Sequence, residues 1–207
     1  MPTSTLTPPA PTENETPKPP APGKYDVPFD DSGIVKYGEA GAGILRQTAP
    51  DVKVVDSEIR ELIADMGRMM YAARGVGLAA PQVGRSVRLF VYDVGDGLEA
   101  LINPVILRKR GQQMEPEEGC LSIPGLRGVV PRALEIEVKG LNKDGRPVRF
   151  KCREFEARVI QHELDHLNGV LFIDLADPKT LHMLSPDEQK AENDGAVEGA
   201  DAPAPAE

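Results

Sequence analysis

The chain has 207 residues, of which 40% are hydrophobic and 28% charged, and its formal net charge is −9. This length allows one ordinary domain with a proper core plus tails. No stretch approaches the roughly 18 consecutive apolar residues that a membrane span requires. The first residues have neither the basic and apolar regions of a secretory signal nor the arginines of a transit peptide, so we expect a cytoplasmic protein without a membrane partner.

The negative charge is concentrated at the two ends of the chain. Residues 1–31 carry a net charge of −3 and residues 185–207 carry −6, which leaves residues 32–184 neutral. No basic stripe and no direct nucleic-acid motif is visible. Residues 1–31 hold nine of the twenty prolines and little to bury, so they are expected to be a disordered Pro-rich tail. Residues 185–207, rich in Ala, Gly, Pro and acids, are expected to be a disordered acidic tail, which places the catalytic domain at 32–184.

An amphipathic helix is predicted over about residues 57–74. Asp56 or Ser57 is a suitable N-cap, and Gly75 is a suitable stop. Between them, apolar residues recur at helical spacing: Ile59, Leu62, Ile63, Met66, Met69, Met70 and Ala73. The methionines are interpreted as core residues rather than as ligands for a cofactor.

The middle of the chain is typical of β-strands. Residues 87–93 and 100–107 are dense in β-branched and aromatic side chains. Leu134, Ile136 and Val138 alternate with Glu135 and Glu137, which predicts a half-exposed strand. The Asn-Lys-Asp-Gly sequence at 142–145 predicts a turn that joins it to a strand at 148–152 as a hairpin.

A second helix is predicted over about residues 154–167, ending at Asn168 and Gly169. Its buried side is expected to contain Phe155, Val159, Ile160, Leu164 and Leu167. Together with the preceding strands, these elements predict the α+β class.

The most informative motif is His162-Glu163-Leu164-Asp165-His166 within this helix. Residues four apart on a helix lie about 40° apart in azimuth and about 6 Å apart along the axis, so two imidazoles can bind one divalent metal. Glu163 projects from the flank of the same face, where a carboxylate can act as a general base in hydrolysis. The alternative is a solvated helix face that happens to carry two histidines, although the whole chain contains only three.

A catalytic metal usually has a third protein ligand. The candidates are Cys120, Cys152, His182 and any carboxylate. Cys120 is favoured because glycine and proline bound its stretch, Glu-Gly-Cys-Leu-Ser-Ile-Pro. Cys152 lies in a predicted strand and is more simply a small buried hydrophobic residue, while His182 lies in a polar stretch and is expected to face solvent.

A third stretch, Gly-Val-Gly-Leu-Ala-Ala-Pro-Gln-Val-Gly at 75–84, is weak evidence when taken alone. Its small residues would let backbone approach a substrate, with Gln82 as a polar side chain among them. A glycine-rich turn after a helix is, however, usually only a turn.

Taken in order, Gly-Val-Gly-Leu-Ala-Ala-Pro-Gln, Glu-Gly-Cys-Leu-Ser and Gln-His-Glu-Leu-Asp-His-Leu resemble the three signature motifs of the peptide deformylase family of bacterial type. The resemblance extends from about residue 44 to residue 174. It implies small mixed or antiparallel sheets packed around a central metal-binding helix, with an amphipathic helix before them. It also favours Cys120 as the third ligand.

The resemblance implies a role for each matching residue. The metal would bind to Cys120, His162 and His166, and Glu163 would act as general base and acid. Gln82 and the backbone N–H of Leu121 would donate to the oxyanion, and the substrate cleft would be lined by Val76, Gly77 and Arg127. Family members remove the formyl group from the N-terminal methionine of nascent proteins and typically use Fe(II), for which Zn(II), Ni(II) or Co(II) are possible substitutes.

The expected partners are therefore N-formylmethionyl nascent peptides, with association to the ribosome and a monomeric state as further expectations. The chain departs from the family after the metal motif, where Asp174-Leu-Ala-Asp-Pro178 interrupts the last helix and leaves the subtype open. Two rival functions are a zinc peptidase that cuts internal peptide bonds, with His182 as a possible ligand, and a non-catalytic metal protein.

Overall fold

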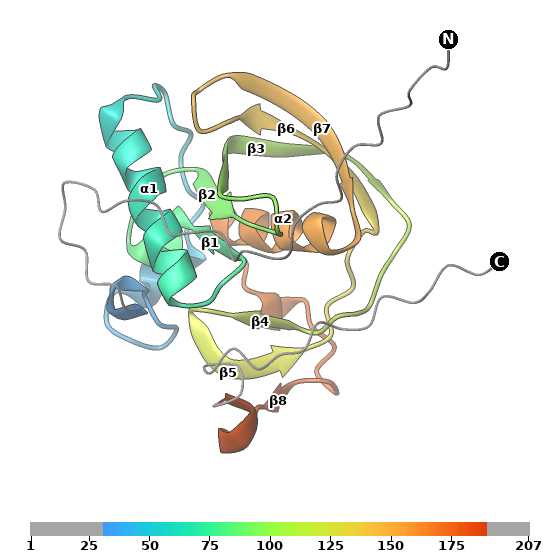
Figure 1. Cartoon of the computed structure of the whole chain (residues 1–207). Coiled ribbons are helices and arrows are strands. Elements are labelled where there is room, and N and C mark those ends of the chain that lie inside the picture. Colours follow the sequence, from blue (N-terminus) through green and yellow to red (C-terminus); the bar gives the residue numbers. More distant parts are fainter. Residues whose placement is uncertain (1–30, 190–207) are drawn as a thin grey trace, which may run out of the picture.

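The computed structural model describes residues 31–189, which form two antiparallel sheets and two long helices (Figure 1). The larger sheet has the strand order β1-β2-β3-β6-β7, and the smaller sheet has the order β4-β5-β8. The larger sheet comprises β1 (Gly77–Ala79), β2 (Leu89–Tyr92), β3 (Glu99–Arg110), β6 (Glu135–Leu141) and β7 (Pro147–Arg153). The smaller sheet comprises β4 (Glu118–Cys120), β5 (Ile123–Gly128) and β8 (His182–Met183). The predicted α+β class is confirmed.

Two helices pack on opposite faces of the larger sheet. Helix α1 (Ser57–Ala72) contributes Met66 and Met70 to a core with the β2 residues Leu89 and Val91. Helix α2 (Glu154–Leu167) packs on the other face, where Ile160 joins a second core cluster. Four short 3₁₀ helices complete the described residues: η1 (Asp31–Gly33), η2 (Ala42–Arg46), η3 (Ala80–Val83) and η4 (Phe172–Asp174).

Helix α1 begins and ends close to the predicted positions. The Asp56 side chain accepts a hydrogen bond from the Ile59 N–H, as an N-cap does. The left-handed residue after the helix is Arg74 (φ 55°) rather than Gly75, whose N–H nevertheless donates to the Met70 carbonyl. The predicted cap and the predicted core role of the methionines are both confirmed.

The strands β6 and β7 form the predicted hairpin. Leu141 pairs with Pro147, and Asn142 Oδ1 accepts from the N–H groups of Asp144 and Arg146 across the turn. Gly145 adopts φ 79°, a conformation that favours glycine. Its local turn chemistry explains why this hairpin is recognisable in the sequence.

Helix α2 has the predicted bounds, but the prediction for Phe155 is wrong. Phe155 is 43% exposed rather than buried and lines the cleft described below. It lies in the first turn of α2, beside the cleft, whereas Val159 and Ile160 one turn later pack in the core. The helix also buries polar residues, namely Arg158, Gln161, Glu163 and His166.

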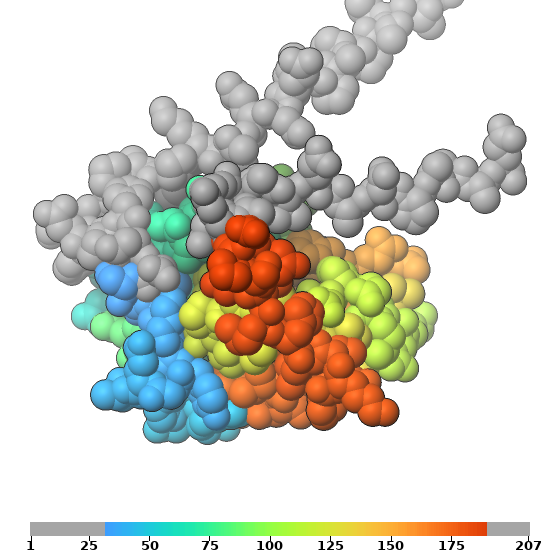
Figure 2. Space-filling view, turned by 90° about the horizontal axis from the view of Figure 1, so that it is seen from below, coloured from blue at the N-terminus to red at the C-terminus, as the bar shows by residue number. Residues whose placement is uncertain are grey.

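The segment after α2 folds back over the smaller sheet. Strand β8 pairs with β5, and the Leu184 N–H donates to the Gly125 carbonyl, so that the orange and red segment lies over β5 in Figure 2. Disorder was expected from residue 185, but residues 185–189 continue as a helical turn. Ser185 and Glu188 exchange side-chain-to-backbone hydrogen bonds there, the capping box that a Ser-x-x-Glu sequence can form.

The remaining parts of the two tails, 1–30 and 190–207, lie outside the described residues. Within residues 31–189, no helix is long and apolar enough to cross a membrane.

Candidate metal centre and active site

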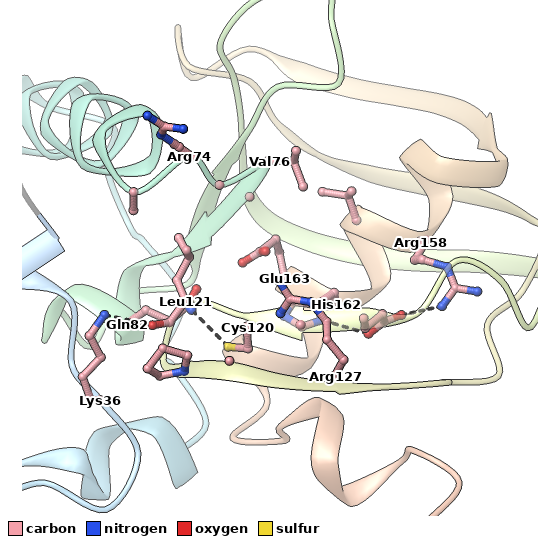
Figure 3. Close-up of a pocket in the computed structure, with 18 of the residues that line it drawn as sticks. Lys36, Arg74, Val76, Gln82, Cys120, Leu121, Arg127, Arg158, His162 and Glu163 are labelled. Carbon is pink, nitrogen blue, oxygen red and sulfur yellow. Dashed lines mark hydrogen bonds and ion pairs between the residues drawn. The ribbon is translucent and has the colours of Figure 1, made fainter. Parts of the chain in front are cut away.

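The three segments that carry the motifs meet at one cleft of about 440 Å³ beside α2 (Figure 3). Strand β4 supplies Cys120, and α2 supplies His162 and His166. The ligand atoms of these three residues all lie within 4.8 Å of one another. Cys120 Sγ is 3.3 Å from His166 Nε2, and the two imidazole rings are 5.0 Å apart in an edge-to-face arrangement. The three predicted ligands are therefore brought together.

A buried carboxylate fixes the orientation of the first imidazole. Glu118 Oε2 lies 2.9 Å from His162 Nδ1, which leaves His162 Nε2 for a metal. Glu118 in turn accepts from Arg132 through both oxygens at 2.8 Å, and from Arg158 Nη1 at 2.7 Å. Burial opposes ionisation of Glu118, but hydrogen bonds from Arg132 and His162 outweigh it and hold its pKa well below the usual range.

Arg132 and Arg158 also contact other residues around the His162–His166 motif. Arg132 Nη1 donates to Asp165 Oδ2 at 2.5 Å, so one guanidinium connects the strand residue Glu118 with the helix residue next to His166. Arg158 lies one helical turn before His162 and also donates to the Val130 carbonyl. Because each buried charge has a partner of opposite sign, the network positions the ligands without leaving an isolated charge.

Glu163, the predicted general base, lies beside the cluster of Cys120, His162 and His166. Glu163 is 4% exposed, and its Oε2 atom has no hydrogen-bond partner among the described residues. Burial raises the pKa of Glu163 to about 7, against the opposing effect of the two histidines. Such a carboxyl group can take up and release a proton near neutral pH.

Gln82 presents its amide nitrogen to the site. Its Oε1 accepts from the Ala79 N–H at 2.8 Å, which fixes the amide so that Nε2 points toward Ser122 Oγ at 3.3 Å and Cys120 Sγ at 3.6 Å. Gln82 is 1% exposed, in η3. The neighbouring Leu121 peptide is held by Lys36 Nζ, which donates to its carbonyl oxygen at 3.1 Å.

The three residues expected to contact substrate also line this cleft. Val76 is exposed at its mouth, and Gly77 lies against Glu163, where an added Cβ would come within 2.8 Å of the carboxyl carbon. Glycine at 77 is therefore required for the close approach of β1 to the carboxylate. The Arg127 guanidinium lies over Gly119, in the space that a Cβ on that residue would occupy, and reaches across the cleft in Figure 3.

The other two candidate ligands lie outside the cluster. Cys152 packs in the core between the sheet and α2, and burial raises the pKa of its thiol to about 12. His182 is 47% exposed on β8, with Nε2 3.7 Å from Glu117 Oε2. Both placements agree with the sequence interpretation.

Sequence reasoning did not assign roles to Glu118, Arg132 or Arg158. Glu118 lies two residues before Cys120, on the same side of a strand, and Arg158 lies four residues before His162 on the same side of the helix. Their spacing could therefore have indicated that both lie near the metal motif. Arg132 lies in the segment between β5 and β6, far in sequence from both motifs, and offered no local signal.

The donor set fits a transition metal. Cys120 supplies a thiolate: burial would raise its pKa, but His166 and His162 hold the pKa well below the usual range for a thiol. One sulfur and two imidazole nitrogens suit Fe(II), Zn(II), Co(II) or Ni(II) rather than Mg(II) or Ca(II). This is the one cluster of at least three potential ligands among residues 31–189.

A profile of the polypeptide deformylase family matches residues 32–182. The peptide deformylase of Pelotomaculum thermopropionicum is 48% identical over 155 residues, which cover 75% of this chain and 98% of the relative. The crystal structure of the Thermotoga maritima peptide deformylase aligns with a TM-score of 0.67 at 44% identity, covering 70% of this chain and 97% of that one. A Synechococcus elongatus peptide deformylase in complex with actinonin aligns with a TM-score of 0.66 at 37% identity, covering 88% of each chain.

The chain belongs to the polypeptide deformylase family. It is a metal-dependent hydrolase that removes the N-formyl group from the N-terminal methionine of newly synthesised proteins and releases formate. Its substrates are N-formylmethionyl peptides, and the alternative of a peptidase that cuts internal bonds is not supported.

Proposed function

We propose that this deformylase holds one divalent metal between Cys120, His162 and His166, with Glu163, Gln82 and Leu121 performing the proton transfer and oxyanion stabilisation. When bound, the metal would supply Lewis acidity and lower the pKa of water toward neutrality. The network of Glu118, Arg132 and Arg158 supports this assignment because it orients one of the ligands.

Glu163 would take a proton from the attacking water and later deliver it to the departing amine nitrogen. Gln82 Nε2 and the Leu121 N–H would donate to the oxygen of the formyl group as negative charge develops on it. The formyl C–N bond breaks, the new C–O bond remains in formate, and the peptide leaves with a free amine. Val76, Gly77 and Arg127 would contact the peptide along the cleft.

The single observation that carries these assignments is the carboxylate of Glu163. It is buried, one of its oxygens has no partner among the described residues, and it lies beside three residues that could hold a metal ion. A metal site with a purely structural role would have no use for such a group, and leaving it without a partner costs free energy.

The metal proposed for the cell is Fe(II), with Zn(II), Ni(II) or Co(II) as possible substitutes. A thiolate ligand donates more charge than a third imidazole and leaves a weaker Lewis acid, and it also makes the site sensitive to oxidation. Fe(II) follows the typical use in the family.

The chain is proposed to act as a monomer in the cytoplasm, in association with ribosomes. One chain supplies every residue assigned to the reaction, and nascent peptides arise at the ribosome. Residues 32–184 are proposed as the catalytic domain, flanked by a Pro-rich tail at 1–31 and an acidic tail at 185–207.

The test is anaerobic purification followed by metal analysis and an assay of formate release on a formyl-Met peptide. About one Fe(II) per chain and formate release that stops on chelation and returns on adding Fe(II) are expected. Full activity after complete removal of the metal would contradict the proposal, as would cleavage of an internal bond in the same peptide without its formyl group.

A further inference from the structure

One face of the larger sheet is only partly covered by the core. Leu78, Leu89, Val91 and Ile102 lie on the side of β1–β3 that α1 covers. Further along the same side, the register of β3, β6 and β7 places charged residues opposite one another. We call this part of the sheet the outer face; it is opposite to the side of β6 and β7 that packs on α2 (Figure 1).

The outer face is strongly basic. Residues directly opposite each other in an antiparallel pair point to the same side of the sheet, and the sides alternate along each strand. The pairing of β3, β6 and β7 therefore places six cations and two carboxylates on this face: Arg108, Arg110, Lys139, Arg149, Lys151 and Arg153 with Glu135 and Glu137. Its net charge is +4, in a domain whose residues 32–184 are neutral overall.

The two carboxylates arrange the arginines rather than neutralise them. Glu137 lies between Arg108 (3.6 Å) and Arg149 (2.6 Å), and is itself covered by them. Glu135 has the same arrangement with Arg110 at 4.0 Å and Arg153 at 3.9 Å. The four arginine side chains remain 62–67% exposed. Each carboxylate thus pairs with two arginines, so each group of three side chains keeps a net charge of +1.

The two lysines add the remaining excess charge. Lys139 and Lys151 are exposed, and neither has an ion-pair partner among residues 31–189. The apolar side chains near these cations are aliphatic: Val105, which is exposed opposite Lys139, and Leu141, Pro147 and Val148, which line a cavity with Lys139 and Arg149. None of them is aromatic. A protein partner usually needs a central aromatic anchor, whereas a phosphate backbone is bound through arginine and lysine without one.

We propose that the outer face of β3, β6 and β7 binds the phosphate backbone of ribosomal RNA. The substrates of this enzyme are new proteins, which emerge from an RNA-rich particle, so an RNA contact would keep the cleft near its substrates. The site would be independent of sequence and sensitive to salt. This rests on the proposed association with ribosomes and goes beyond the catalytic assignments. It departs from the sequence-based expectation of no nucleic-acid contact, because only strand pairing brings the basic residues of 108–110, 139 and 149–153 together.

The salt dependence can be estimated from the excess charge. If each of four excess cations contacts one phosphate, the affinity should fall about 10²-fold between about 50 and 200 mM salt. Replacing two of them should reduce the slope of log affinity against log salt by about 1.8 and weaken binding at 50 mM by at least about tenfold.

The experiment uses the full metal-loaded chain, purified bacterial ribosomes and a fluorescent 20-base-pair RNA duplex. The test variant is Lys139→Gln with Lys151→Gln, because neither lysine forms an ion pair with Glu135 or Glu137, which bind the arginines. The matched control is Arg60→Gln with Lys179→Gln, which removes the same charge from exposed positions that are not part of the outer face. Co-sedimentation with ribosomes and with anionic lipid vesicles, binding to the duplex and formate release from a free formyl-Met peptide are measured for all three proteins.

The expected result is that the parent and the control bind ribosomes and duplex alike, that the test variant binds both more weakly with the smaller salt slope, and that all three release formate equally. Absence of binding by the parent, equal loss in both variants, or binding to anionic lipid vesicles but not to RNA would overturn the proposal. Ribosome binding that is insensitive to Lys139 and Lys151 would also overturn it. Failure of the catalytic assignments would appear separately, as altered formate release with RNA binding intact.

Discussion

The two long helices α1 and α2 have 16 and 14 residues and pack on the same sheet, but they bury different kinds of side chain. Helix α1 buries Ile63 and three methionines, and its one buried charged residue, Arg68, pairs with Asp65 of the same helix. Helix α2 buries a glutamine, a glutamate, a histidine and an arginine beside its apolar residues.

The difference lies in where the polar partners come from. Buried polar groups of α2 meet partners from distant segments, as Arg158 does with Glu118 and Gln161 with the backbone of Ala133. Unpaired polar groups cost free energy in the core, so the partners supplied by the segment from β4 to β6 stabilise the polar residues around the cleft. Glu163 Oε2 and His166 Nδ1 are left without a partner among the described residues. Changes in α1 should therefore lower stability alone, while changes at the α2 residues that line or support the cleft should alter metal binding or catalysis.

The largest effects are expected at the metal ligands. Cys120→Ser replaces a thiolate with a poor ligand, and His162→Ala or His166→Ala removes a ligand, so each variant should lose metal and activity together. Metal analysis and formate release are measured on the same samples. The controls are Cys152→Ser and His182→Ala, which should retain both. Full metal occupancy in Cys120→Ser would rule out the ligand assignment.

Gln82→Leu should have the next largest effect. It keeps a similar volume but removes the amide donor, so kcat should fall about 10²–10³-fold, equivalent to roughly 2.7–4 kcal/mol, with metal content unchanged. Gln161→Leu is a matched control, because this buried glutamine bonds to the backbone away from the cleft and should lose stability but keep kcat. If only KM rises in Gln82→Leu, the residue holds substrate and does not stabilise the oxyanion.

Glu118→Gln should act through His162 rather than on the substrate. The change weakens the hydrogen bond that orients the imidazole, and such changes typically lower metal affinity by about 10–100-fold. Competition with a chelator measures this affinity. Glu137→Gln is the control, because Glu137 also lies between two arginines but far from the metal ligands. Equal affinity in the two variants would remove Glu118 from the support of the site.

Met66→Ala should have the smallest effect on activity. Met66 is fully buried between α1 and the sheet, and removing such a side chain costs about 2–5 kcal/mol of stability. Thermal unfolding should show a lower Tm, while kcat at a temperature well below Tm stays within about twofold of the parent. A large fall in kcat in the folded variant would show that α1 contributes to catalysis and would remove the contrast between the helices.

The sequence predicted most of what depends on local pattern. The N-cap at Asp56, the turn at 142–145 and the bounds of α2 follow from spacing and turn chemistry, and the three motifs meet at the cleft. The exposure of Phe155 was not predictable from helical period, because it depends on the cleft beside the first turn of α2. Arg132 was not predictable either, since its partners Glu118 and Asp165 lie 14 and 33 residues away in sequence.

The basic outer face illustrates the same limit. Its cations come from two basic stretches, 108–110 and 146–153, and from Lys139, and these lie far apart in the sequence. Only the pairing register, including the irregularity between Ile106 and Arg108, brings Arg108 and Arg110 to the same side as Lys139 and Lys151. Net charge over the domain gave no indication, because the remaining residues compensate for it.

The central claim is that Glu163 transfers the proton, and Glu163→Gln tests it most directly. The variant keeps the shape of the side chain and all three proposed ligands, so it should fold and hold about one metal per chain. Formate release from a formyl-Met peptide is compared with the parent at matched metal content, with Glu156→Gln on the same helix as the control. We expect a fall of about 10²–10⁴-fold in kcat for Glu163→Gln, toward the upper end because one residue serves both halves of the reaction, and no comparable change for the control. Formate release by Glu163→Gln close to that of the parent would contradict the account.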